Sequence, residues 1–238
     1  MKKSTKFFIA AAVLISCICL VAISFLWNAG AKDYLDCYKL LHDAYSSDRI
    51  DMDVSVSVDS SPLDVSVDFN AVKIPFDDSS ATKFTLHGAL GKVEIYQIGE
   101  DAFLSAGERY ASSELPEDFT ELLKWCSELY RSSYTITKEQ NGENIRYQVE
   151  VPGDEVTAFM KSYGGKLSEI DIRYSDCTLI VTAQSGELRT IQLSGAASYT
   201  FPTGQKLSAD MNMNADINAL GDKVEGFSVP ENLKILSD

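Results

Sequence analysis

The sequence predicts an α+β fold: one large, strongly bent antiparallel sheet of about eleven strands, covered by about three helices, after an N-terminal transmembrane helix. Long runs in which apolar and polar residues alternate with a period of two predict strands of an antiparallel sheet that is wet on one face. Three other stretches repeat their apolar residues at spacings of three and four, which is typical of amphipathic helices. A flat sheet of this many strands rarely persists, so we expect it to bend.

The N-terminal helix is predicted from the uncharged run between Phe7 and Trp27, which is 21 residues long. A helix of this length spans roughly 31 Å, about the thickness of a bilayer core. Lys2, Lys3 and Lys6 precede the run. By the positive-inside rule, these lysines place the N-terminus in the cytoplasm and everything after residue 31 outside it.

Two other interpretations of residues 1–31 stay open. Ala29-Gly30-Ala31 has the small-x-small pattern of a signal-peptidase site, which would make the segment a cleaved signal and the protein secreted. Leu14-Ile15-Ser16-Cys17 partly matches a lipobox, in which Cys17 would be acylated and anchor the protein through lipid. The apolar run continues after Cys17, whereas a lipoprotein normally continues with a polar tether. All three interpretations place residues 32–238 outside the cytoplasm.

The exported part opens with a predicted helix and a long hairpin. Tyr34, Leu35, Tyr38 and Leu41 recur at helical spacing, so we expect a helix over 33–47. The period then changes to two. Two strands, 50–58 and 63–71, alternate Val and other apolar residues with Asp and Ser on either side of a turn at 60–62.

The rest of the chain is predicted to continue as a meander without a linker. A second helix is expected over 116–130, where Pro116 stands at the first helical position, and a third over 154–163. Asn141-Gly142 is a strong hairpin signal between two short strands. The remaining strands are predicted at 84–86, 93–98, 102–111, 134–136, 145–151, 170–174, 177–183, 191–201 and 207–217. Residues 32–238 are therefore expected to form a single domain.

The charge excludes some partners. The chain carries 21 basic and 35 acidic residues, a net charge of −14, and the part beyond residue 31 carries −17 because only three lysines precede it. Such a surface repels nucleic acid. No D-x-[DN]-x-[DN]-G calcium loop is present, and the acidic residues stand singly in the strands. We expect them on the solvated face, with no metal site.

Few residues offer catalytic chemistry. The chain has two histidines, His42 and His87, both expected on polar faces, and it lacks nucleophile-elbow, zinc-protease and phosphate-loop motifs. We therefore predict a protein that is not an enzyme and needs no cofactor. Cys37, Cys126 and Cys177 form an odd set without metal-binding spacing, so buried free thiols are expected.

The apolar face of the strands is the candidate ligand site. It includes methionines, whose flexible side chains adapt to irregular apolar partners. Either an acyl chain lies on this face, or the face packs on the helices. The candidate residues are Met52, Val54, Val56, Val65, Phe69, Phe84, Met211 and Met213.

The layout resembles the superfamily of bacterial lipoprotein carriers that includes LolA, LolB and LppX. The features that carry this resemblance are the N-terminal membrane or lipid signal, the short helix, the two long alternating strands, the helical insertion and the second alternating block. The second half is most similar to uncharacterised exported lipoproteins of Gram-positive bacteria, through Ser185-Gly186-Glu187-Leu188, the paired strands up to Ile217, and Phe227-Ser228-Val229-Pro230-Glu231. The resemblance covers roughly 33–232.

The resemblance implies a half-open β-barrel with a helical lid and a cavity for acyl chains, although a fold by itself does not establish a cargo. The expected function is that of a membrane-tethered extracytoplasmic protein that binds lipid or the acyl chain of a lipoprotein. The alternative is an envelope protein–protein interaction module with a filled core and no ligand.

Overall fold

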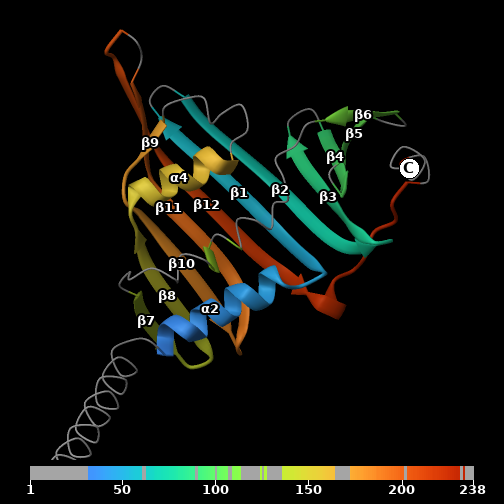
Figure 1. The fold of residues 1–238 in the computed structure, drawn as a ribbon, viewed down its shortest axis with the longest axis horizontal. Coiled ribbons are helices and arrows are strands. Elements are labelled where there is room, and N and C mark those ends of the chain that lie inside the picture. The colour runs from blue at the N-terminus through green and yellow to red at the C-terminus, as the bar shows by residue number, and fades with distance from the viewer. Residues whose placement is uncertain are drawn as a thin grey trace, which may run out of the picture.

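The structure is a computed structural model, and it describes residues 32–60, 63–88, 91–99, 101–106, 109–113, 124, 126–127, 136–163, 172–200, 203–230 and 233. Most of these residues form one antiparallel sheet (Figure 1). Its strands are β1 (Ile50–Ser60), β2 (Leu63–Phe76), β3 (Ser79–Gly88), β4 (Gly91–Ile98), β5 (Asp101–Ala106), β6 (Arg109–Ser113), β7 (Ile136–Asn141), β8 (Asn144–Val151), β9 (Ile172–Tyr174), β10 (Cys177–Gln184), β11 (Glu187–Thr200) and β12 (Lys206–Leu220).

The first and last strands of the sheet meet at its centre. The order is β6-β5-β4-β3-β2-β1-β12-β11-β10-β8-β7, and β9 pairs with β11 beside this path. The eleven strands of the path match the predicted number, and the sheet is not closed, because β6 and β7 stand at opposite ends. Asn141 and Asn144 pair across the β7–β8 turn, where Gly142 has a φ of 62°, so the predicted hairpin is confirmed.

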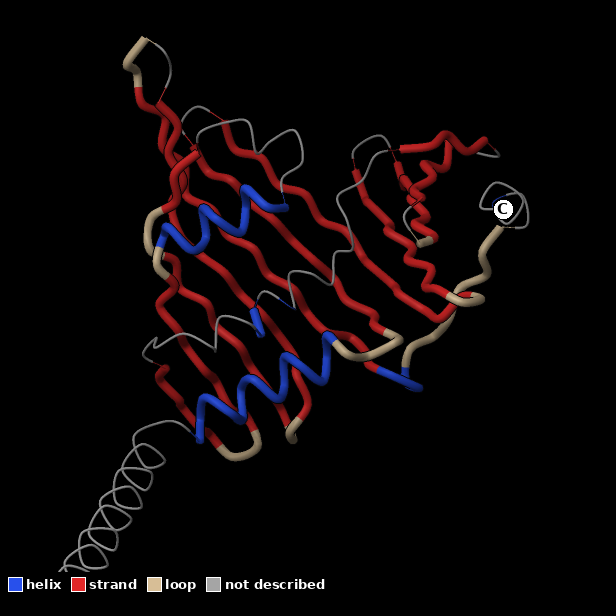
Figure 2. The backbone as a smooth tube through the Cα atoms, viewed as in Figure 1, coloured by secondary structure: helices blue, strands red, loops and turns tan. Residues whose placement is uncertain are grey.

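Two α-helices cross the same face of the sheet in the part of the chain that the structure describes: α2 (Lys32–Tyr45) and α4 (Gly153–Tyr163) (Figure 2). α2 lies against β7 and β11, and α4 lies against β9. We call the face that these helices cover the inner face, and the opposite one the outer face.

The main core lies between the helices and the inner face. α2 contributes Cys37, Leu41 and Ala44, and α4 contributes Val156, all at most 1% exposed. The spacings of four and three between the α2 residues bring them onto one stripe of that helix. The strand residues that are buried with them are Ile50, Met52, Val54, Ala71, Tyr147, Val149, Val151, Cys177, Leu179, Val181, Leu188, Ile191, Ala215 and Ile217.

A second core lies on the outer face, where the chain end covers β2 to β5. Phe227 lies 6.0 Å from the ring of Tyr96, and the ammonium of Lys83 lies 5.4 Å above the Phe227 ring. Val229 and Leu233 are also buried there. The sequence did not predict this packing, because the local pattern of the tail gives no sign of which face it covers.

The rest of the outer face is polar, as the alternation predicted. Asp53 of β1 stands opposite Asn70 of β2 and Asp216 of β12. The amide nitrogen of Asn70 donates to Asp51 at 2.8 Å and to Asp53 at 3.1 Å, and that of Asn218 donates to Asp53 at 2.9 Å. These amides supply donors between carboxylates that would otherwise repel one another.

Some boundaries differ from the prediction. The expected strand 102–111 is two strands, β5 and β6, which form a hairpin of their own. Of the expected helix 116–130, only Lys124, Cys126 and Ser127 are described, and they are helical. The structure thus confirms two of the three expected helices.

The predicted anchor and Cys17 lie outside the described residues. None of the helices that the structure describes is long and apolar enough to span a membrane. The membrane segment over 1–31 stays a prediction.

Candidate ligand-binding face

The strand register places all eight candidate residues on the inner face. Met52 stands opposite Ile217 and Ala71, and Ala71 stands opposite Phe84. The neighbouring rows follow the same register and contain the remaining candidates. These rows are Ala215–Val54–Phe69, Met213–Val56–Val67 and Met211–Val58–Val65.

The eight residues differ in burial along this face. Met52 and Val54 are 1% and 6% exposed and belong to the filled core. Val56, Phe69, Phe84, Met211 and Met213 are half-buried, and Val65 is 44% exposed. The inner face therefore has a packed part, which includes Met52 and Val54, and an open part, which includes Val65 and the five half-buried residues. The sequence analysis had placed all eight residues in one group.

An aromatic pair stands between the two parts. The rings of Phe69 and Phe84 have centroids 6.2 Å apart and are tilted by 60°, a favoured geometry for aromatic side chains. No helix of the described ranges lies over β3 to β6 in Figure 1. The pair marks where helix packing ends and the open part begins.

The open part also contains residues that the sequence analysis missed. Val67, Val93 and Leu104 share the inner face and are 36 to 42% exposed, with Leu86 and Ile95 half-buried beside them. Exposed large apolar side chains that adjoin in this way mark interaction surfaces more often than isolated ones do. Their alternation was visible in the sequence, but strand order was needed to bring them together.

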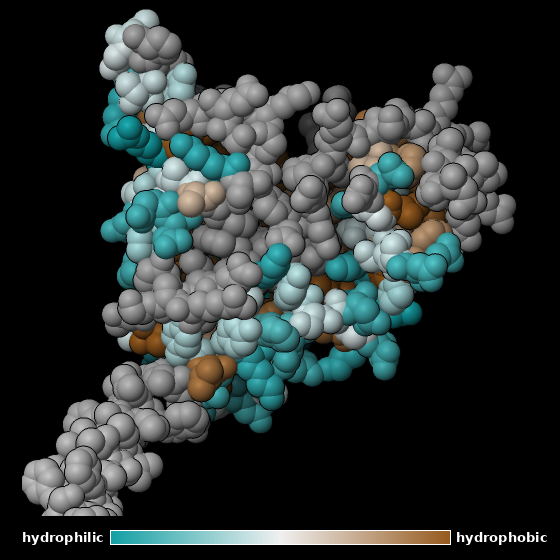
Figure 3. Space-filling view, in the orientation of Figure 1, coloured by the Kyte–Doolittle hydropathy of each residue, from teal (hydrophilic) through white to brown (hydrophobic). Residues whose placement is uncertain are grey.

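Figure 3 shows how the molecule presents these properties on its helix side. Hydrophilic residues line the lower edge of the view, and hydrophobic ones reach the surface in the right-hand part, where Figure 1 places β3 to β5. Apolar side chains therefore reach the surface on this side of the molecule, next to hydrophilic ones.

Neither histidine belongs to a catalytic arrangement among the described residues. His42 is exposed on α2, where its Nδ1 lies 3.3 Å from the hydroxyl of Ser46. His87 is exposed on the outer face, opposite Lys92. Within the same part of the chain, no three His, Cys, Asp or Glu side chains are grouped to hold a metal ion.

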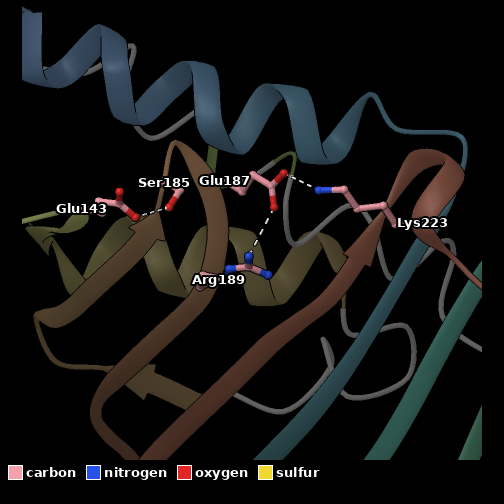
Figure 4. A network of polar contacts seen from close by, with 5 residues as sticks. All are labelled: Glu143, Ser185, Glu187, Arg189 and Lys223. Carbon is pink, nitrogen blue, oxygen red and sulfur yellow. Dashed lines mark hydrogen bonds and ion pairs between the residues drawn. The ribbon is translucent and has the colours of Figure 1, made fainter.

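A cleft of about 500 Å³ lies between α2 and the turn from β10 to β11, and its lining includes Leu40, Asp43, Glu187, Arg189, Ile217 and Lys223. Glu187 accepts hydrogen bonds from Lys223 and, at 3.3 Å, from Arg189, while Ser185 donates to Glu143 at 2.7 Å (Figure 4). The hydrogen bond from Lys223 lowers the pKa of Glu187. Three charged residues of the cleft, Glu187, Arg189 and Lys223, are thus joined by ion pairs.

The three cysteines are buried free thiols, as predicted. Cys37 and Cys126 belong to the same core and have no exposed surface. Burial raises the pKa of the Cys126 thiol strongly, and the neighbouring Cys37 adds to the shift. The Cys126 thiol is therefore protonated and unreactive at neutral pH.

Comparison with known proteins gives likeness of fold alone. No protein-family model matches the sequence, and no curated protein sequence matches it. Among solved structures, the chain is similar to lipoprotein LppX of Mycobacterium tuberculosis, with a TM-score of 0.46 and 10% identity over 81% of this chain and 96% of LppX. For LprF of Mycobacterium bovis the TM-score is 0.44, with 11% identity over 82% and 96% of the two chains.

A LolA superfamily protein from Nitrosomonas europaea is similar with a TM-score of 0.33, at 10% identity over 82% of this chain and 95% of that one. LppX and the LolA superfamily are also the proteins that the layout of the sequence resembles. None of these three proteins is described as an enzyme.

Proposed function

We propose that this chain is an extracytoplasmic protein that binds the acyl chain of a lipid or lipoprotein on the open part of its inner face. The observation that carries the proposal is a patch of exposed apolar side chains on the inner face of β2, β4 and β5. These are Val65, Val67, Val93 and Leu104, and half-buried Phe69, Phe84, Leu86 and Ile95 lie among them. Burial of apolar surface stabilises a complex by about 25 cal/mol per Å². Binding of an acyl chain over these residues would bury their exposed apolar surface and so stabilise the complex.

The composition of the face supports the same proposal. Met211 and Met213 of β12 adjoin Val58 and Val56 of β1. Methionine has three rotatable bonds, so these side chains adjust to chains of different length or branching. The outer face is acidic and polar, which keeps a large sheet soluble while its other face binds an apolar ligand.

The proposal includes attachment to the membrane. Residues 1–31 would hold residues 32–238 at the outer side of the membrane, either as a helix or through acylated Cys17. α2 begins directly after this segment, at Lys32. The binding face would then stay close to the bilayer from which a lipid is taken. In this proposal, residues 1–31 attach the protein to the membrane and residues 32–238 form the ligand-binding domain.

Lipid binding is tested on the full chain exchanged from detergent into an amphipol. Native mass spectrometry and lipid extraction measure copurifying lipid, and a fluorescent long-chain fatty acid measures uptake. The variant Val67→Asp places a carboxylate among the exposed apolar residues. Because burial of a charge next to an acyl chain is costly, we expect at least about tenfold weaker uptake.

The control is Ser66→Asp, which adds the same charge one residue away on the outer face, opposite Ser57. We expect it to leave uptake unchanged. A dry core without lipid, together with no fatty-acid uptake by the unchanged chain, would refute the proposal. That result would favour the alternative function, an envelope interaction module with a filled core, for which the packed half of the inner face provides the structural basis.

A further inference from the structure

A further cleft, of about 450 Å³, lies over the strands at the β7 end of the sheet, and two arginines line it. Arg146 comes from β8 and Arg189 from β11. Glu139 is the one acidic residue of its described lining; the uncharged lining residues are Gln140, Asn141, Asn144, Ile145, Thr182, Ala183 and Gln184. We call it the arginine cleft. Its lining carries more positive than negative charge, in a chain whose net charge is −14.

Strand register brings Arg146 to the outer face of the sheet. Arg146 stands opposite Glu139 of β7 on one side and opposite Thr182 of β10 on the other. The next residues along β8 and β10 towards the centre of the sheet, Tyr147 and Val181, are at most 1% exposed and belong to the main core on the inner face. Because side chains alternate along a strand, Arg146 and Thr182 point to the outer face.

A β-bulge brings Arg189 to the same place. Thr182 stands opposite Thr190 of β11, whereas Ala183 stands opposite Leu188, so Arg189 is an extra residue between the two pairs. Such a bulge re-aims a side chain that a regular strand would direct elsewhere. Arg189 consequently lines the arginine cleft beside Thr182.

Both guanidinium groups have donors that their ion pairs leave unused. Nη1 of Arg146 lies 3.4 Å from Glu139, and Nη2 of Arg189 lies 3.3 Å from Glu187. Each pair engages one nitrogen of a group that carries five N–H donors. Nε of Arg189 is buried and has no hydrogen-bond partner among the described residues. Because a buried donor without an acceptor is costly, it favours an acceptor that a ligand supplies.

The arginine cleft has the chemistry of a phosphate site. A guanidinium group binds an oxyanion through two parallel hydrogen bonds, and one such pair occupies both oxygens of a carboxylate. A phosphate group has further oxygens and so accepts from two guanidinium groups at once. The amides of Asn144 and Gln184, which are exposed at the cleft, add uncharged donors.

The size of the cleft favours a phosphate ester over the bare ion. A volume of about 450 Å³ falls within the range of about 300 to 1,000 Å³ that is typical of small-molecule sites. It therefore leaves room for the group to which the phosphate is esterified. The side chains of Arg146 and Arg189 are 37% and 41% exposed, so a ligand reaches both from solvent.

We propose that Arg146 and Arg189 bind the phosphate group of a phosphate ester. This site is separate from the acyl site, because β7, β8 and β10 stand at one end of the sheet and β3 to β5 towards the other, and the two sites use opposite faces. The inference therefore does not depend on the proposed function. A soluble ester and a lipid headgroup present the same phosphate chemistry, and the experiment distinguishes them.

The test titrates glycerol phosphate against the full chain in nonionic detergent micelles and follows binding by phosphorus NMR. We expect a Kd of about 1 mM or below. Arg146→Gln should weaken binding at least about tenfold, because it removes a charge-assisted hydrogen bond. Arg146→Lys should retain part of the affinity, since the charge stays while the planar fork is lost. The urea midpoint of Arg146→Gln should match that of the unchanged chain, which excludes unfolding as the cause.

The matched control is Arg173→Gln, which removes the same charge from an exposed position of β9, opposite Ser198 and away from the cleft. We expect it to keep the affinity. Equal weakening by Arg173→Gln and Arg146→Gln, or no binding to the unchanged chain at about 10 mM, overturns the site. Inorganic phosphate that binds as tightly as glycerol phosphate overturns the preference for an ester.

The source of the phosphate is decided by adding phosphatidylglycerol to the micelles. Displacement of glycerol phosphate by this lipid supports the site as one for a lipid headgroup. Retention of glycerol phosphate supports it as one for a soluble ester. Neither result uses the acyl site, so loss of the arginine cleft leaves the proposed function standing.

Discussion

The ammonium of Lys138 in β7 donates a 2.7 Å hydrogen bond to Oδ1 of Asp33 in the first turn of α2. The two residues are 105 positions apart in the sequence. Lys138 also lies 3.8 Å from Asp36 and 5.6 Å from the centre of the Tyr147 ring. This contact ties the helix that covers the inner face to an edge strand of the sheet.

Lys138→Gln is expected to lower the free energy of unfolding by about 1 kcal/mol, because the pair is partly buried and hydrogen-bonded. Urea unfolding followed by circular dichroism measures the change. In a double-mutant cycle with Asp33→Asn, most of the loss should appear as coupling between the two sites.

Arg146→Gln serves as the control. Arg146 pairs with Glu139 at 3.4 Å on the exposed side of the same hairpin, where both side chains are well solvated. Its loss should change stability by no more than a few tenths of a kcal/mol. Equal effects of the two substitutions would contradict the role assigned to Lys138.

Gly195→Ala is expected to destabilise the sheet strongly. A methyl group at Gly195 in β11 would overlap the sulfur of Cys177 in β10. Such overpacking typically costs about 1 to 3 kcal/mol. Cys177→Ala removes the sulfur, so the double variant should recover part of the stability. Thermal unfolding measures the stability of the two single variants and the double variant. A double variant no more stable than Gly195→Ala would show that the Cys177 sulfur does not cause the destabilisation.

Stability should fall in alkaline solution. Burial raises the pKa of Cys177, Tyr147 and Tyr174, and the hydrogen bond to Asp33 raises that of Lys138. A group whose folded pKa is raised stabilises the protein fully below its unfolded pKa, and this stabilisation is lost as the pH rises through the folded pKa. The ordinary values are 9.0 for the thiol, 10.0 for the tyrosines and 10.5 for the lysine.

The free energy of unfolding should therefore decline from about pH 9 upward. Urea unfolding at a series of pH values measures it. Tyr147→Phe removes one of these groups and should make the decline shallower. A free energy that stays constant up to pH 11 would contradict the assignment.

Leu233→Ala should destabilise the protein by about 2 to 4 kcal/mol, as is usual for a fully buried leucine. Leu233 packs in the outer-face core with Val229 of the tail and Ile98 of β4. Ser228→Ala, an exposed change in the same tail, should have little effect. If both variants melt at the same temperature as the unchanged chain, the tail does not contribute to the folded domain.

The thiols of Cys37, Cys126 and Cys177 should react with a thiol reagent only after unfolding. All three are buried, and burial raises the pKa of Cys126 and Cys177. Absorbance after addition of Ellman's reagent, with and without denaturant, measures the accessible thiols; Cys17 and Cys19 are replaced by serine so that they do not contribute. Rapid reaction of Cys37 in the native protein would contradict the packing of α2.

Local patterns determined much of the fold. The period of two between Ile50 and Ala71 predicted both long strands and the outward position of the acids, because side chains alternate strictly across a strand. The period of α2 predicted its buried residues Leu41 and Ala44, which lie three positions apart. The break within 102–111 was missed, because Gly107 is an isolated glycine within an alternating pattern and does not by itself predict a hairpin turn.

The sequence predicted the face on which the candidate residues lie, and their role as a ligand site stays a prediction. Met211 and Val65 were assigned correctly to one face, because alternation alone decides the face. Sequence gave no measure of how deeply each residue is buried, and so Met52 of the packed core was grouped with exposed Val65. Burial depends on which helix lies over a strand, and this is a relationship between distant segments.

The sequence by itself determined the elements, the polar and apolar faces of the strands, and the absence of common catalytic motifs, since these follow from side-chain chemistry and local periodicity. The tertiary structure decided that β1 and β12 pair at the centre, that the chain end covers the outer face of β2 to β5, and that Arg146 and Arg189 line one cleft. Each of these depends on strand order and register, which hydrogen bonds between residues far apart in the chain establish.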